Sequence, residues 1–233
     1  MKYFYHSQER IILALDGAKN YQKMVRELGD KVYAVKIHDL YDRHGPGIIA
    51  EIKKLGAKRV WVDFKLHDIP HTVNLRTQAL ARAGADIISV QTSGGVKMIK
   101  AAKEGFGKGE VYTITLLTSY DEQETKEIYS ANSHGLVRRW VKLAQKAGIK
   151  KIVCSPKELT ELSRAPELRG MKFIVPGVRS LGINIHDQSR IDTPVNALRN
   201  GADKLVIGRQ ITKAKDHVTA LKRIEQEIAS VKK

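Results

Sequence analysis

The residues with the clearest chemical potential are three charged side chains, Asp63, Lys65 and Asp68, in the segment 61–72. Asp63 and Lys65 are two positions apart, so on a β-strand their side chains would point to the same face. Asp68 follows where that strand should end, because Ile69-Pro70 requires an extended backbone. A short strand rarely carries an acid and a base on its buried face unless they pair or take part in a reaction. This segment is therefore the first candidate for a functional site.

The elements that must position this segment alternate between strands and helices. Five of the expected strands come after a helical pattern that ends in glycine, and glycine suits the left-handed position that closes a helix. The strands are apolar on both faces, which is typical of parallel strands covered by helices. The five glycines are Gly29, Gly56, Gly84, Gly148 and Gly201. The expected strands are 11–15, 32–35, 59–62, 86–90, 111–117, 151–153, 171–175 and 204–207, and the expected helices are 20–28, 47–55, 72–83, 96–103, 135–147, 157–162, 195–200 and 216–232.

Eight strand–helix units in 233 residues predict an α/β fold, a (β/α)8 TIM barrel, as a single catalytic domain over residues 1–233. A doubly wound open sheet is the alternative. Barrel enzymes build their active sites at the carboxyl ends of the strands. Most of the expected strands end in polar or charged residues, which places a functional site at that end of the barrel. These residues are Asp16, Lys36, Asp63, Lys65, Thr118, Ser119, Arg179 and Arg209.

The segments after the seventh and eighth expected strands favour a phosphate site, because barrels commonly bind phosphate there. Gly177 and Gly208 would let the backbone approach a ligand closely, and Arg179 or Arg209 could make paired hydrogen bonds to phosphate oxygens. Gln188, in the polar loop 180–190, could cover the phosphate. The alternatives are ordinary turns and an exposed glutamine.

A row of alternating charges is expected at the same mouth, formed by Lys36, Asp63, Lys65 and Asp68. Neighbouring carboxylates would hold Lys65 in its ammonium form, which suits a proton donor and does not suit Schiff-base chemistry. The alternative is a structural network of ion pairs.

The overall charge is unusual, with 41 Lys and Arg against 25 Asp and Glu, a formal net charge of +16. Such a balance is often found in nucleic-acid-binding proteins, which remain an alternative class. The basic residues are scattered, however, which favours a solvated surface or a field that attracts an anionic substrate. No apolar run approaches the ~20 residues of a membrane span, and no signal-peptide core begins the chain, so we expect a cytoplasmic protein without membrane or nucleic-acid partners.

Other kinds of site have little support in the sequence. The single cysteine, Cys154, excludes an intramolecular disulfide framework and is expected to be a buried small side chain. The histidines near the 61–72 segment lack a clear third metal ligand, and nucleotide-binding glycine motifs are absent. We therefore expect neither a metal nor a cofactor.

The segment 63–72 closely resembles the signature of the orotidine 5′-phosphate decarboxylase family, in its bacterial type. The Asp-x-Lys pair alone is shared with a wider set of barrel enzymes, so a metal-dependent enzyme of sugar phosphates, such as a keto-sugar-phosphate decarboxylase or a pentulose-phosphate epimerase, is the alternative. The longer pattern Asp-x-Lys-x-x-Asp-Ile-Pro-x-Thr is far more specific. Further similar blocks are 14–16, 35–36, 92–95, 117–119, 153–155, 176–179, 187–190, 193–194 and 201–212.

The resemblance implies decarboxylation of orotidine 5′-phosphate to UMP in pyrimidine biosynthesis, without a cofactor. It implies that Lys65 donates a proton to C6 and that Asp63 orients Lys65. Asp68 and Thr72 would complete the site of a neighbouring subunit in a homodimer. The family usually has glycine where this chain has His38, so the resemblance does not determine the backbone conformation after Lys36. The implied substrate-binding residues are Asp16, Lys36, Asp63, Ile69, Pro70, Thr72, Thr118, Arg179, Gln188, Gly208 and Arg209.

Overall fold

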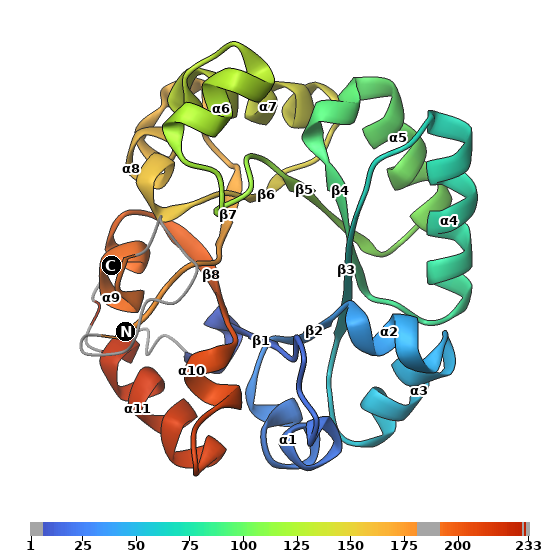
Figure 1. The fold of residues 1–233 in the computed structure, drawn as a ribbon, viewed down its shortest axis with the longest axis vertical. Helices are drawn as coiled ribbons and strands as arrows, with labels where there is room; N and C mark the ends of the chain where they lie inside the picture. The colour runs from blue at the N-terminus through green and yellow to red at the C-terminus, as the bar shows by residue number, and fades with distance from the viewer. Residues whose placement is uncertain (1–6, 181–191, 230, 232–233) are drawn as a thin grey trace.

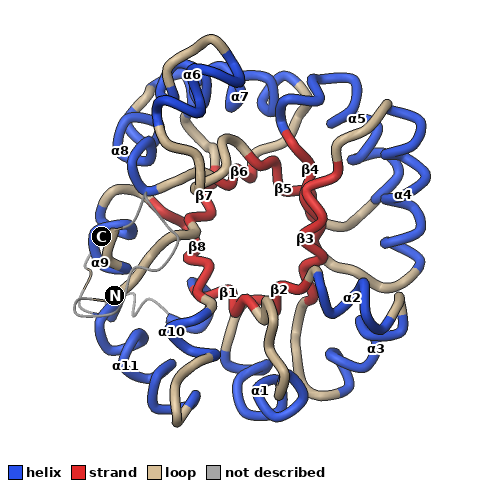
Figure 2. Tube along the Cα trace, in the orientation of Figure 1, coloured by secondary structure: helices blue, strands red, loops and turns tan. Residues whose placement is uncertain are grey.

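The computed structural model describes residues 7–180, 192–229 and 231. Within these ranges, eight parallel strands follow one another around a closed barrel, and helices surround it (Figures 1 and 2). The last strand pairs with the first in a regular register, with Ile12 opposite Val206. The closed barrel is confirmed, and the open sheet is wrong. The strands are β1 (Ile11–Ala14), β2 (Ala34–Ile37), β3 (Val60–Leu66), β4 (Ile87–Gln91), β5 (Glu110–Ile114), β6 (Lys151–Val153), β7 (Lys172–Val175) and β8 (Ala202–Ile207).

The helices form the outer layer, and every helix expected from the sequence has a counterpart. None of the described helices is both long enough and apolar enough to cross a membrane. The α-helices are α1 (Tyr21–Leu28), α2 (Asp39–His44), α3 (Gly47–Lys54), α4 (Pro70–Arg82), α5 (Gly95–Phe106), α6 (Glu122–Tyr129), α7 (Ser133–Lys146), α8 (Pro156–Arg164), α9 (Pro194–Arg199), α10 (Arg209–Thr212) and α11 (His217–Ala229).

The barrel interior is filled by side chains that alternate along the strands. Trp61 and Tyr112 meet edge to face in this interior, with ring centroids 5.0 Å apart. Ile12, Ile174 and other buried aliphatic residues complete the layer around them. A second and larger apolar cluster lies between strands and helices. The interior is thus a packed core rather than a pore, so a ligand would bind at an end of the barrel.

Several expected boundaries were wrong. β3 continues to Leu66 rather than ending at 62, and β5 ends at Ile114, so Thr118 lies in the loop beyond the strand. The short helices α2, α6 and α10 occupy segments in which the sequence patterns predicted no helix. Two of them have side-chain caps: the ring of His38 accepts a hydrogen bond from the backbone N–H of Asp39 at α2, and the carboxylate of Asp121 accepts one from the backbone N–H of Glu124 at α6.

Four of the five glycines adopt the expected positive φ, and Gly29 does not. Its φ is −59°, and it begins a 3-10 turn rather than closing a helix in the left-handed region. A Cβ at Gly29 would lie 2.9 Å from the backbone nitrogen of Ala57. This glycine is therefore required for close approach of two loops, a contact that the sequence pattern does not reveal.

Candidate active site

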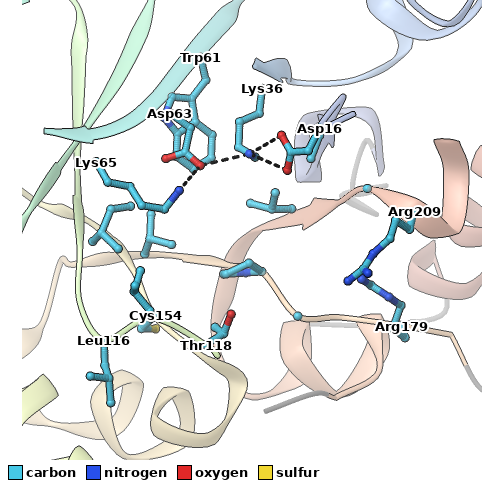
Figure 3. Close-up of a pocket in the computed structure, with 18 residues that line it drawn as sticks. Asp16, Lys36, Trp61, Asp63, Lys65, Leu116, Thr118, Cys154, Arg179 and Arg209 are labelled. Carbon is cyan, nitrogen blue, oxygen red and sulfur yellow. Dashed lines mark hydrogen bonds and ion pairs between the residues drawn. The ribbon is translucent and has the colours of Figure 1, made fainter. Parts of the chain in front are cut away.

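A cavity of about 440 Å³ opens at the carboxyl ends of the strands, where the sequence predicted the site. Its size suits a small organic ligand. Figure 3 shows Asp16, which follows β1, with Lys36 of β2 and the charged residues of β3 on one side of the cavity and two arginines on the other. The predicted residues that line it are Asp16, Lys36, Asp63, Lys65, Thr118, Arg179, Gly208 and Arg209, together with Gly177 and Cys154.

The charge row runs without a break from Asp16, just after β1, through Lys36 of β2 to Asp63 and Lys65 of β3. Lys36 Nζ lies 2.9 and 3.0 Å from the two carboxylate oxygens of Asp16 and 3.1 Å from Oδ2 of Asp63. Lys65 Nζ donates to the same Oδ2 at 2.9 Å (Figure 3). Lys36 and Asp63 are buried, whereas about a third of the Lys65 side chain remains exposed to the cavity. One carboxylate therefore holds two ammonium groups, and Lys65 is the most exposed of these three cavity-lining side chains.

The electrostatics of the buried pair favour its charged form. Burial alone would raise the pKa of Asp63, but the adjacent charges of Lys36 and Lys65 outweigh it and lower that pKa. Burial alone would lower the pKa of Lys36, but Asp63 and Asp16 outweigh it and raise that pKa. Both groups are consequently ionised at neutral pH.

The backbone at Lys65 is unusual. Its φ is +49°, in the left-handed region that non-glycine residues rarely adopt, and the β3–β4 register shifts between Val62 and Leu66. The backbone N–H of Lys65 donates to the hydroxyl of Ser89 on β4 at 3.0 Å. Sequence reasoning missed Ser89, because its visible signal was one hydroxyl among the apolar residues 87–90 of β4.

The backbone of His38 does not adopt the positive φ that would favour glycine at this position. Its φ is −142°, its Nδ1 accepts a hydrogen bond from the backbone N–H of Asp39, and it thereby caps α2. Its Nε2 lies 3.1 Å from Oδ1 of Asp16. Possible metal-ligating atoms of these three residues lie within 4.8 Å of one another, but Lys36 already places its ammonium on both oxygens of Asp16. That charge disfavours a cation at the cluster.

The opposite side of the cavity is cationic. Arg179 and Arg209 line this side, and their side chains point toward each other (Figure 3). Arg179 is buried and donates through Nη1 to the carbonyl of Val178 at 2.7 Å. Gly177, with φ +76°, makes the turn that brings this segment to the cavity. Gln188 lies outside the described residues.

A second group of predicted residues does not face this cavity. Asp68, Ile69 and Pro70 are exposed, and Thr72 lies half-buried in the first turn of α4. The carboxylate of Asp68 accepts a hydrogen bond from the backbone N–H of Ile69 at 2.7 Å. Ile69 is 64% exposed, an unusual fraction for a large apolar side chain. The structure thus separates the predicted site into a cavity and an exposed segment.

Comparison with known proteins gives a consistent result. Residues 9–224 match the model of the orotidine 5′-phosphate decarboxylase / HUMPS family. The orotidine 5′-phosphate decarboxylase of Streptococcus pyogenes serotype M3 is 39% identical over 229 residues, covering 95% of this chain and 99% of the relative.

Solved structures agree with this result. The orotidine 5′-phosphate decarboxylase of Lactobacillus acidophilus superimposes with a TM-score of 0.79 at 29% identity, covering 94% of this chain and 98% of the other. That of Pyrococcus horikoshii OT3 gives a TM-score of 0.77 at 25% identity, covering 95% and 100%. The chain therefore belongs to the orotidine 5′-phosphate decarboxylase / HUMPS family of carboxy-lyases.

Proposed function

We propose that this protein decarboxylates orotidine 5′-phosphate to UMP in pyrimidine biosynthesis, with Lys65 as the proton donor and without a cofactor. The observation that carries the proposal is the Asp63 carboxylate that holds Lys65 Nζ at 2.9 Å on the wall of a cavity with two arginines opposite. The S. pyogenes relative carries this activity in its name. The cavity thus offers an ammonium group for the base and a cationic end for the phosphate of one ligand.

The proposed reaction follows from these charges. The C6–carboxylate bond breaks, carbon dioxide leaves, and the electron pair remains on C6. The Lys65 ammonium stabilises that developing negative charge and then transfers its proton to C6. Neutral Lys65 afterwards takes a proton from solvent. Asp63 keeps the ammonium aimed at the cavity, and Lys36 keeps Asp63 ionised.

We assign the remaining predicted residues to ligand binding. Asp16 and Lys36 would hold ribose hydroxyls, and Thr118 would contact the pyrimidine. Arg179, Gln188, Gly208 and Arg209 would bind the phosphate, with Gly208 acting through its backbone. Binding energy from the distant phosphate can then serve the reacting carbon by fixing its position.

We also propose that the enzyme is a homodimer in which Asp68 and Thr72 complete the neighbouring site. Neither residue lines its own cavity: Asp68 adjoins the 64% exposed Ile69, and Thr72 lies on α4, the helix that carries the 50% exposed Leu75. An apolar face of this kind, next to charged residues, suits contact with a second copy. Ile69 and Pro70 would place Asp68 of the partner subunit close to the substrate.

The decisive experiment is a substrate assay by ultraviolet absorbance. Chelator-treated protein should convert orotidine 5′-phosphate into UMP, and Lys65→Ala should lose the activity while keeping its fold. Lys108→Ala is a matched control because Lys108 is exposed on a loop away from the cavity. Full turnover by Lys65→Ala would refute its role, and a strict metal requirement would favour sugar-phosphate chemistry instead.

Subunit complementation tests the dimer. An equal mixture of Lys65→Ala and Asp68→Ala chains should recover about a quarter of the wild-type activity, because half of randomly assorted dimers are mixed and each has one intact site. Each variant alone should remain inactive. If the mixture stays as inactive as its components after subunit exchange, Asp68 does not serve the neighbouring site.

A further inference from the structure

The hydroxyl of Ser89, on β4, contacts the part of β3 in which Lys65 has its left-handed backbone. Ser89 is in the middle of β4 and is fully buried. Its Oγ lies 2.6 Å from Oδ1 of Asp63 and 3.0 Å from the backbone nitrogen of Lys65. A buried hydroxyl needs hydrogen-bonding partners, and both partners here belong to the pair that the proposed reaction uses.

The direction of both hydrogen bonds is fixed by chemistry. The backbone N–H of Lys65 can only donate, so Ser89 Oγ must accept from it. Asp63 is ionised and can only accept, so Ser89 must give its proton to Oδ1. This leaves Oδ2 of Asp63 for the ammonium groups of Lys36 and Lys65. A single hydroxyl thereby orients the carboxylate and its neighbouring main chain together.

We propose that Ser89 is a positioning residue that holds the Lys65 backbone in its left-handed conformation and aligns Asp63 with the Lys65 ammonium. The left-handed backbone is unfavourable for a residue other than glycine, so it persists only where its surroundings fix it. The shifted β3–β4 register removes Lys65 from a regular ladder, and the Ser89 side chain supplies the partner for its N–H. Ser89 does not line the cavity, so it acts through the other two residues.

The kinetic consequence is specific and rests on the proposed decarboxylation. Ser89→Ala should lower kcat about 10- to 100-fold, because a displacement of the reacting group by about 1 Å has an effect of this size. KM should change little, since the groups assigned to ribose and phosphate are untouched. The acid limb of the kcat–pH profile should also move to higher pH, because the hydrogen bond from Ser89 helps to lower the pKa of Asp63.

A matched control separates positioning from general damage to the barrel. Thr113 lies on the adjacent strand β5, is equally buried, and donates its hydroxyl to the carbonyl of Lys151 at 3.3 Å. Thr113→Val removes this hydroxyl at nearly constant volume and should leave kcat and its pH profile unchanged. Ser89→Thr, which keeps the hydroxyl, should recover activity relative to Ser89→Ala. Ser89→Cys, similar in size to serine but a weaker donor, serves if the alanine variant does not fold.

Hydrogen exchange gives a readout that is independent of turnover. The Lys65 amide should exchange faster in Ser89→Ala than in the wild type or in Thr113→Val, because its acceptor is gone. Unchanged exchange at Lys65, or an undiminished kcat in an active enzyme, would overturn the positioning role. A wild-type protein without decarboxylase activity would instead refute the proposed function, and the exchange experiment would still decide what Ser89 does to the Lys65 backbone.

Discussion

Replacement of Asp63 by asparagine removes one negative charge from between two buried or half-buried ammonium groups. Both lysine nitrogens contact Oδ2, at 3.1 and 2.9 Å, so they lie no more than about 6 Å apart. At that separation two like charges repel by about 3 kcal/mol at an effective dielectric constant of about 20. The asparagine can still accept the hydrogen bond from Ser89, so the change is mainly electrostatic.

The expected loss of stability follows from this geometry. Removing one partner of a buried ion pair destabilises a protein by about 3–5 kcal/mol, because the remaining charge is left without compensation. Lys36 keeps a second carboxylate in Asp16, but that side chain is 43% exposed, so its compensation is weakened by solvent. We therefore expect Asp63→Asn to lower the free energy of unfolding by about 3–5 kcal/mol at pH 7.

Urea denaturation without ligand, followed by circular dichroism, measures this loss. The double variant Asp63→Asn/Lys36→Met should recover about 2–3 kcal/mol relative to Asp63→Asn, since only one lysine then remains. The control Lys36→Met alone should be destabilised, because Asp63 loses its fully buried partner. A loss below about 1 kcal/mol in Asp63→Asn, or a double variant no more stable than Asp63→Asn, would refute the electrostatic reasoning.

Three other changes test separate parts of the structure. Burial lowers the pKa of Lys204 from its ordinary 10.5 to about 8, so between these pH values the unfolded chain binds the extra proton and the stability of the fold rises with pH. Lys204→Met should therefore be more stable than the wild type at pH 7 by about 1 kcal/mol, after allowance for partial exposure. If the difference between their urea midpoints does not shrink by pH 9.5, this reasoning is wrong. A Cβ at Gly105 would lie 2.4 Å from backbone of α4, so Gly105→Ala should cost about 1–3 kcal/mol by thermal unfolding, whereas Gly47→Ala, which meets nothing within 4 Å, should not destabilise. Leu75→Glu should produce monomers in sedimentation, while Ile128→Glu, at a similarly exposed residue on α6, should leave the dimer intact; equal effects of the two would argue against the α4 face.

The barrel was predictable because its signals repeat along the chain. Each strand is apolar on both faces, and the eight units left few ways to cover such strands. The grouping of Asp16, Lys36 and Asp63 at one cavity was also predictable, because parallel strands in a barrel all end on the same side.

The remaining features depend on contacts between neighbouring strands, which no local pattern records. The left-handed backbone at Lys65 opposes the residue's own preference and exists because β3 shifts its register against β4. The partners of Ser89 depend on that same register. The expected continuation of strand five to 117 was wrong because Leu116 and Leu117 leave the ladder to line the cavity, although their apolar character is that of a strand.

The aromatic layer beneath the charge row has a consequence for how substrate, products and water enter and leave the enzyme. Trp61 and Tyr112 fill the barrel axis, with 1% and 0% of their surfaces exposed, so the cavity is floored by side chains of the core. Among the described residues, the cavity opens at the carboxyl ends of the strands, so under the proposed reaction carbon dioxide, UMP and the water that reprotonates Lys65 would use the same opening as the incoming substrate. The products must therefore leave through this opening before Lys65 can be reprotonated and the next substrate can bind.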